Sequence, residues 1–253
     1  MNPQPLLTRI SANLKHLLGG NLVGVYIHGS IAFGCFNWQS SDIDFIVVAE
    51  SPIDSQTKRQ ILQMLDGMRP EFPPKGLEVS IVLHKHCKTF TYPAPYEFHY
   101  SNDYIDDCSD SFKTDYDLAA HFTVIKSAGI TLCGNPIAGI FGDVPKADYL
   151  DSIGKDIENA VEDVEKNPVY IILNLCRVCA YIQDGLVLSK KSGGQWGLAN
   201  LPHIYHGLIS AILESYESGD AAANDPMQIS FCKYMTALII AQNGSKINSA
   251  QIL

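Results

Sequence analysis

The sequence lacks a long hydrophobic run, an excess of basic residues, internal repeats and low-complexity segments. Without an apolar stretch long enough to cross a bilayer, we expect no integral membrane segment and no membrane partner. Lys and Arg total 18 against 27 Asp and Glu, a formal net charge of −9, which argues against nonspecific binding to nucleic acid. A cationic small molecule or a metal-bound nucleotide is the partner that such a charge favours.

Cysteine is present, but not in a pattern that builds disulfides or a zinc site. The seven cysteines are odd in number and scattered, which favours a reducing, cytoplasmic location. Cys176 and Cys179 form a C-x-x-C, yet no second such pair exists, so packing in a helix is the simpler interpretation. The first twenty residues predict an amphipathic helix rather than a signal peptide, because Arg9 and Lys15 interrupt the apolar run.

The spacing of apolar residues along the sequence changes near residue 148. Before it, apolar runs at 22–29, 44–50 and 77–84 predict strands, and residues 54–69 repeat apolar positions at helical spacing. After it the pattern is helical throughout, which predicts an α/β (α+β) domain with a mixed sheet over residues 1–148 and an all-α helical bundle over 149–253. A cleft between two such domains is a common place for a small-molecule site.

Within the helical half, turn signals divide the predicted helices. These signals are Asn167-Pro168, Gly193-Gly194 and Asn224-Asp225-Pro226. The helices expected between them cover residues 149–166, 168–185, 194–218 and 227–243.

One stretch, "VYIHGSIAFGCFNWQSSDIDFIVV" at residues 25–48, carries most of the chemistry. A strand that ends at Gly29-Ser30 before a helical turn can bring backbone N–H groups and a hydroxyl close to a triphosphate. Asp42 and Asp44 stand at i and i+2, so they point to the same face of a strand. Two carboxylates placed so repel unless a cation lies between them, and oxygen ligands of this kind suit Mg²⁺ that carries substrate phosphates.

A third acid follows in "GLEVSIVL". Glu78 shares a strand face with Ser80, while its apolar neighbours point the other way into the core. If this strand neighbours the strand of Asp44, Glu78 joins the same cluster, either as a further metal ligand or as a general base. Each acid alone is more often a solvated surface residue. Their combined spacing predicts a nucleotidyl-transfer site.

This stretch resembles the signature of the DNA polymerase β-like nucleotidyltransferase superfamily. The chain as a whole is similar to the aminoglycoside adenylyltransferases that modify streptomycin and spectinomycin, and the segments "YPAPYEFHYS", "TDYDLAAHFTVIKSAGITLCG" and "PVYIILNLCRVCAYIQDGLVLSKKSGGQWGLANLP" look like further blocks of that family. The resemblance implies transfer of AMP from Mg-ATP to a hydroxyl of a cationic aminoglycoside or aminocyclitol, with an implied link to antibiotic resistance.

The resemblance also implies a role for individual residues. Gly29, Ser30 and Ser41 would contact the triphosphate of ATP. Asp42 and Asp44 would hold Mg²⁺, and Glu78 would be the catalytic base. Lys190, in a predicted connection between helices, would reach the nucleotide phosphates. The neighbouring Lys191 is the alternative to Lys190 for this contact. Arg177 matches an arginine of the family for which a structural ion pair is an equally good interpretation.

The chain departs from the family in one respect, because the segment "SNDYIDDCSDS" just after "YEFHY" contains no Trp, whereas drug-modifying members carry one there that packs on the substrate. A different small molecule or a protein therefore remains an alternative acceptor. A catalytically inactive nucleotide-binding module is a third reading, but it predicts loss of a carboxylate and all three are present. An acidic run in the same region is either a surface for a polycation or a solvated loop; it comprises Asp103, Asp106, Asp107 and Asp110.

Overall fold

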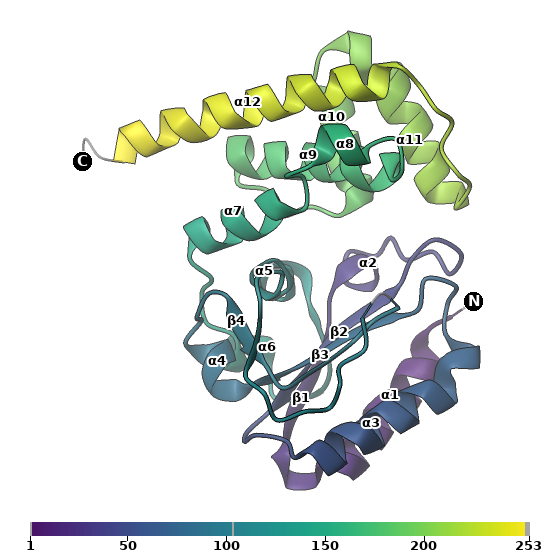
Figure 1. Cartoon of the computed structure of the whole chain (residues 1–253), viewed down its shortest axis with the longest axis vertical. Coiled ribbons are helices and arrows are strands. Elements are labelled where there is room, and N and C mark those ends of the chain that lie inside the picture. The colour runs from purple at the N-terminus through teal and green to yellow at the C-terminus, as the bar shows by residue number, and fades with distance from the viewer. Residues whose placement is uncertain (1, 103, 251–253) are drawn as a thin grey trace. The chain divides into compact units, whose positions relative to one another are not determined.

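The structure is a computed structural model that describes residues 2–102 and 104–250, with side chains up to residue 242. The chain divides into two compact units, residues 1–149 and 150–253, which are described separately below (Figure 1). We expect residues 1–148 to be the nucleotidyltransferase domain and residues 149–253 to be a helical domain that closes on substrate and nucleotide, and both roles stay predictions.

The first unit is built on a five-stranded mixed sheet in the order β5-β3-β2-β1-β7. The central strands β2 and β3 are parallel, and every other neighbouring pair is antiparallel. The predicted mixed sheet is confirmed. The strands are β1 (Leu22–Ile27), β2 (Ile43–Ala49), β3 (Leu77–Leu83), β5 (Phe98–Tyr100) and β7 (Ile130–Gly134).

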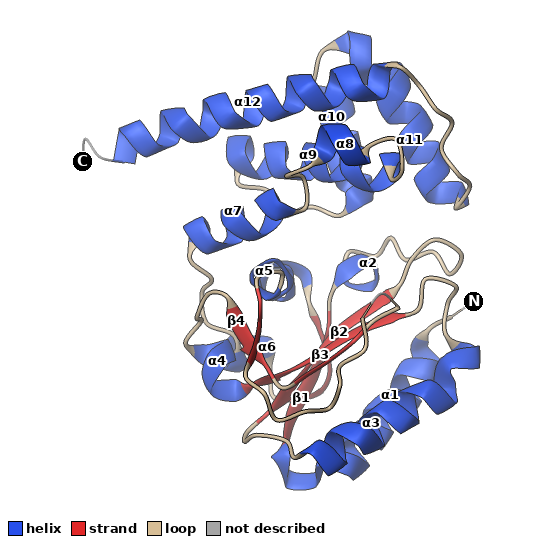
Figure 2. Ribbon diagram, in the orientation of Figure 1, coloured by secondary structure: helices blue, strands red, loops and turns tan. Residues whose placement is uncertain are grey.

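Helices cover both faces of this sheet (Figure 2). Helices α1 (Gln4–Leu18) and α3 (Ser55–Met68) pack on the face that receives the odd-numbered residues of β2, such as Phe45 and Val47. Helices α4 (His84–Lys88), α5 (Leu118–Ala128) and α6 (Ile137–Ile140) belong to the opposite face, against Ile46 and Val48. The even-numbered residues of β2 therefore point toward α5.

Short elements complete the first unit. Helix α2 (Gly29–Ala32) directly follows β1, and strands β4 (Ala94–Tyr96) and β6 (Lys113–Asp115) form a separate two-stranded ribbon. Single 3₁₀ turns occur at Gly19–Asn21 and Arg69–Glu71.

The second unit is helical, as predicted, but its helices are divided differently. The expected helix at 149–166 is two helices, α7 (Lys146–Lys155), which begins in the first unit, and α8 (Ala160–Asp163). The expected helix at 194–218 is also two, because Pro202 ends α10 (Lys190–Asn200) before α11 (His206–Ser218). Between them lies the 3₁₀ turn His203–Tyr205, and the remaining helices are α9 (Pro168–Asp184) and α12 (Met227–Ala250).

Gly193-Gly194 is not the turn that the sequence predicted, since α10 runs straight through it. A side chain at Gly194 would collide with Leu173 of α9 and Leu213 of α11, and one at Gly193 would meet Arg177 of α9. The glycines let three helices approach closely, and this packing offsets their poor helix propensity.

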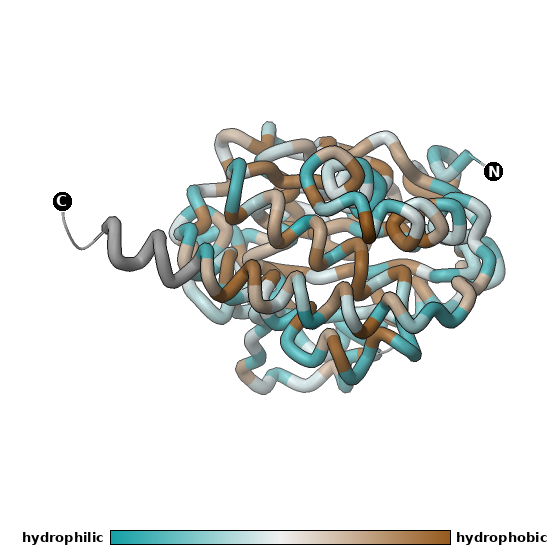
Figure 3. Tube along the Cα trace, turned by 90° about the horizontal axis from the view of Figure 1, so that it is seen from above, coloured by the Kyte–Doolittle hydropathy of each residue, from teal (hydrophilic) through white to brown (hydrophobic). Residues whose placement is uncertain are grey.

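Hydrophobic and hydrophilic residues alternate along the helices in Figure 3. No helix among residues 2–102 and 104–250 is both long and apolar enough to span a bilayer.

Candidate active site

Three carboxylates converge at the first residues of β2 and β3. The two strands are parallel and in register, so that Asp44 of β2 lies directly beside Glu78 of β3. Asp42 precedes Asp44 by two residues and lies just outside the strand. One oxygen from each of the three side chains lies within 4.8 Å of the others. The structure thus brings together the acids that the sequence singled out.

The alternation of the strands explains this arrangement. Ile43 and Leu77 point into the core with α1 and α3, so the residues that follow them, Asp44 and Glu78, must point to the other face. Asp44 is 8 % exposed, and the Glu78 side chain is 27 % exposed. Carboxylates so close and so sheltered repel each other, and a cation among them relieves that repulsion.

The Gly29-Ser30 turn lies next to the same cluster. The backbone N–H of His28 donates to the carbonyl of Asp44 at 3.0 Å, which ties the end of β1 to the start of β2. Gly29 has a φ of +60°, and a Cβ built on it would overlap the Asp44 carboxylate. The hydroxyl of Ser30 is buried and has no hydrogen-bond partner within the described part of the chain. A buried hydroxyl of this kind is a ready donor for a ligand oxygen.

Ser41 holds the loop that leads into the carboxylates. Its hydroxyl accepts from the backbone N–H of Asn37 at 3.1 Å, and its own N–H donates to the carbonyl of Asn37 at 2.8 Å. The side chain is 4 % exposed. These bonds show that Ser41 fixes the turn before Asp42, while its contact with a triphosphate stays a prediction.

Two histidines and an aspartate that the sequence analysis missed complete the site. His121 of α5 places its Nε2 atom 3.2 Å from Asp117 and 3.6 Å from Glu78. The ring of His28 lies against that of His121, with centroids 4.5 Å apart. Asp117 and His121 stand at i and i+4 in "DLAAHF", a spacing that places both on one helix face and could have drawn attention to them.

Charge and burial act in opposite directions on these groups. Burial alone lowers the pKa of His121, but the carboxylates of Asp117 and Glu78 outweigh it and raise that pKa well above its usual value. Burial, together with the nearby His121, holds the pKa of His28 well below its usual value. Burial raises the pKa of Glu78, and His121 opposes that shift. His121 is therefore the cation of the pair, and His28 is neutral.

The lysines of the second unit differ in their surroundings. Lys190 is the first residue of α10 rather than part of a connection, and its Nζ lies 5.0 Å from the ring centroid of Tyr170. Lys191 pairs with Glu217 at 2.7 Å. Among the described residues no carboxylate forms an ion pair with Lys190, which leaves its charge available to a ligand.

The other residues of that unit which the sequence singled out have structural roles. Arg177 donates to the carbonyl of Leu188 at 2.8 Å, which anchors the segment before α10. Trp196 is buried and donates to Asp184. Cys176 and Cys179 are buried free thiols whose pKa is raised by burial, so they pack as small apolar residues.

The acidic run is not a uniform acidic surface. Asp106 is buried and pairs with Lys113 at 2.7 Å, and Asp107 pairs with the same lysine at 2.5 Å. Asp110 lies 3.7 Å from the buried Lys58 of α3. Asp103 lies outside the described residues. Pairing within the protein thus involves three of the four acids, and a surface for a polycation in this segment stays a prediction.

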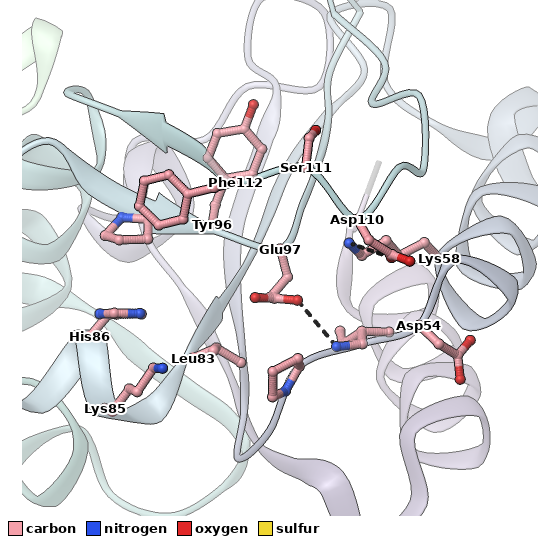
Figure 4. Close-up of a pocket in the computed structure, with 13 residues that line it drawn as sticks. Asp54, Lys58, Leu83, Lys85, His86, Tyr96, Glu97, Asp110, Ser111 and Phe112 are labelled. Carbon is pink, nitrogen blue, oxygen red and sulfur yellow. Dashed lines mark hydrogen bonds and ion pairs between the residues drawn. The ribbon is translucent and has the colours of Figure 1, made fainter.

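Asp110 and Lys58 line a pocket of about 500 Å³, drawn in Figure 4 together with Tyr96, Glu97 and Phe112. The pocket also involves Leu83, the last residue of β3, so it lies at the opposite end of that strand from Glu78. It contains none of the predicted catalytic residues. The carboxylate cluster, rather than this pocket, is the candidate active site.

Comparison with known proteins agrees with this geometry. Residues 139–237 match the family described as aminoglycoside adenylyltransferase, C-terminal domain. Over 221 residues the chain is 25% identical to a spectinomycin 9-adenylyltransferase of Staphylococcus aureus, an alignment that covers 80% of this chain and 81% of that protein. The chain therefore resembles the aminoglycoside adenylyltransferases over most of its length, and its residues 139–237 match the C-terminal domain of that family. The predicted family and enzyme class are therefore confirmed.

Other members of the family extend the similarity to almost the whole chain. A spectinomycin 9-adenylyltransferase of Enterococcus faecalis is 21% identical over 225 residues, which cover 85% of this chain and 88% of that protein. A crystal structure of spectinomycin adenyltransferase from Enterococcus faecalis with ATP and spectinomycin superposes with a TM-score of 0.79 at 20% identity, covering 94% of this chain and 99% of that one. The chain therefore has the adenylyltransferase fold.

The residues present fit the Mg²⁺ and ATP that this fold implies. Asp42, Asp44 and Glu78 offer three hard oxygen ligands within reach of one ion, the donor type that Mg²⁺ prefers. The partnerless hydroxyl of Ser30 lies in the turn that approaches Asp44, where a phosphate could accept from it.

Proposed function

We propose that this protein transfers AMP from Mg-ATP to a hydroxyl of an aminocyclitol, with spectinomycin as the first candidate acceptor. The observation that carries the proposal is the convergence of Asp42, Asp44 and Glu78 beside the Ser30 turn, in a chain whose family relatives are spectinomycin adenylyltransferases. The absence of a described helix that could span a bilayer is compatible with a reaction in the cytoplasm, where ATP and Mg²⁺ are available.

In this proposal the first unit binds the nucleotide through its charged cluster. Asp42 and Asp44 hold the ion, Gly29 lets the backbone approach the phosphates, and the hydroxyls of Ser30 and Ser41 donate to phosphate oxygens. When bound, Mg²⁺ offsets phosphate charge and stabilises the charge that develops on the departing pyrophosphate. Lys190 adds a positive charge from the second unit.

Glu78 is the general base of the proposed reaction. A sugar-like hydroxyl is a poor nucleophile at neutral pH, so it needs a carboxylate that accepts its proton as its oxygen attacks the α-phosphorus. The O–H bond breaks, the proton moves to Glu78, an O–P bond forms, and the bond to pyrophosphate breaks. Asp44 lies beside Glu78 across the strand pair, which keeps the base next to the nucleotide.

The acceptor is the open part of the proposal. The net charge of −9 favours a positively charged acceptor, and an aminocyclitol carries positive charge at neutral pH. The segment after "YEFHYS" has no Trp and instead carries Tyr104, which is 48% exposed and lies against His99 with ring centroids 5.9 Å apart. This departure favours an acceptor that does not need a stacking indole, and it keeps another small molecule or a protein as the alternative.

The test is pyrophosphate release from Mg-ATP across a panel of aminocyclitols and aminoglycosides, with mass spectrometry of the products. We expect release with spectinomycin and a product heavier by one AMP. The Asp42→Asn variant is the matched control and should release none. Release only with a protein acceptor would favour the alternative, and no release with any acceptor or protein would contradict nucleotidyl transfer.

A further inference from the structure

His121 links the proposed catalytic base to a second carboxylate. It projects from α5 between Glu78 of β3 and Asp117 at the start of its own helix, with Nε2 3.6 Å and 3.2 Å from their oxygens. The side chain is 12% exposed, so solvent screens these contacts only weakly. A single ring nitrogen thus faces two acids from two different elements.

A second histidine packs against the ring of His121. His28 lies against it at a centroid distance of 4.5 Å, and the backbone N–H of His28 is bonded to the carbonyl of Asp44. This contact connects α5 to the start of β2, where the carboxylates meet. The orientation of the His121 ring is therefore coupled to the geometry of the cluster.

A purely structural histidine would be expected to use both ring nitrogens. The Nδ1 atom of His121 is buried and has no hydrogen-bond partner in the described part of the chain, while Nε2 faces the two acids. Leaving a buried polar atom unpaired costs roughly 1–3 kcal/mol, so a side chain selected for stability alone is a poor explanation. The arrangement favours what Nε2 does for Glu78.

Glu78 has two competing neighbours. Its carboxylate lies within 4.8 Å of the oxygens of Asp42 and Asp44, close enough to become a third ligand of their metal ion. A base must instead keep an oxygen free for the acceptor hydroxyl. The ion pair with His121 of α5 gives Glu78 a partner other than the metal ion that Asp42 and Asp44 would hold.

We propose that His121 is a positioning residue of the transfer reaction, which bridges Glu78 to Asp117 and thereby orients Glu78 as the base. The inference rests on the adenylyl transfer proposed above. His121 touches neither reacting atom; it acts through Glu78.

The test compares His121→Met with His121→Gln, whose amide nitrogen can take the place of Nε2. We expect His121→Met to lower kcat about 10–100-fold, the range seen when an orienting partner is removed, while KM for the acceptor and calorimetric binding of Mg-ATP stay nearly unchanged. His121→Gln should recover a large part of kcat. In a Glu78→Gln background, His121→Met should cause no further loss, because the two residues act as one unit.

The matched control is His84→Met. His84 pairs with Glu50 at 3.1 Å just beyond the other ends of β2 and β3, so the same kind of pair is removed away from the cluster. We expect its kcat to equal that of the wild type.

Each outcome decides a separate point. Unchanged kcat in His121→Met, or further loss in the Glu78→Gln background, would overturn the positioning role. An equal loss in His121→Met and His121→Gln with a lowered unfolding temperature would assign His121 to stability instead. Lost Mg-ATP binding would make it part of the nucleotide site and would also overturn the proposal. A wild type that releases no pyrophosphate would reject the transfer reaction itself, which distinguishes the two failures.

Discussion

The charged side chains at the two ends of the parallel strand pair β2 and β3 differ in whether they have partners of opposite charge. At the end where the strands begin, Asp42, Asp44 and Glu78 gather, and His121 lies beside Glu78. Just beyond the other end, each of two acids has a partner: Glu50 pairs with His84, and the carboxylate of Glu97 accepts a hydrogen bond from the backbone N–H of Ile53.

The difference separates charges that serve stability from charges that serve chemistry. A partly buried charge that only stabilises the fold needs a partner, since desolvation otherwise raises its free energy. An excess of one sign is tolerated where a ligand will supply the opposite charge. The starting end of the strand pair has this excess, and the pocket of Figure 4, where Lys58 meets Asp110, does not.

The largest expected effect comes from Asp44→Asn, which removes one charge from the excess. We expect turnover to fall to background because Mg-ATP loses a ligand. The unfolding temperature should change by less than about 3 °C, since repulsion is relieved and no cavity is created. Pyrophosphate release, calorimetry with Mg-ATP and thermal unfolding measure the three quantities. Asp110→Asn is the control at the other end, and full activity in Asp44→Asn would refute the metal-ligand role.

The next effect is that of Glu78→Gln, which keeps the shape of the side chain and removes its charge. If Glu78 is the base, kcat should fall about 10²–10⁴-fold, with nearly unchanged binding of ATP and acceptor. Turnover beside binding calorimetry separates the roles. Retained turnover would reject both, and lost nucleotide binding would make Glu78 a metal ligand.

The two lysines of α10 show the same contrast between a charge paired within the protein and a charge that can contact a ligand. Lys190→Ala should weaken ATP binding by about tenfold, roughly 1.5 kcal/mol, because a phosphate contact is lost. Lys191→Ala removes the pair with Glu217, and because both side chains are about half exposed, its loss should change ATP binding little. Calorimetric titration with ATP measures both. Weaker ATP binding in Lys191→Ala but not in Lys190→Ala would show that Lys191, rather than Lys190, matches the phosphate-binding lysine of the family.

The smallest effect on turnover is expected for Lys113→Met, which breaks a paired charge. Asp106 would stay buried without its cation, so we expect a loss of about 3 kcal/mol and a fall of roughly 6–12 °C in unfolding temperature. At a temperature where the variant is folded, kcat should match the wild type. A large loss of kcat there would contradict the division between structural and functional charges.

Much of the first unit could be predicted because its signals are local. The alternation of apolar and polar residues around Asp44 and Glu78 fixes which face each carboxylate occupies, and the parallel register then brings them together. Their convergence needed only one assumption, that the two strands are neighbours.

What could not be predicted depends on contacts between distant segments. Gly193 and Gly194 favour a turn in isolation, and only the closeness of α9 and α11 reveals that they belong inside a helix. His121 is one of several histidines in the sequence, and only the position of α5 over the sheet brings it to Glu78. Local sequence patterns do not contain this information.

The close approach of Gly29 to Asp44 limits how this gene can change. Each amino acid that one base substitution in a glycine codon can introduce has a Cβ, and at this position a Cβ overlaps the Asp44 carboxylate and meets a left-handed backbone. We therefore expect every single-base change that replaces Gly29 with another amino acid to disturb the site. A synonymous change is therefore the substitution that codon 29 can accept without altering the site.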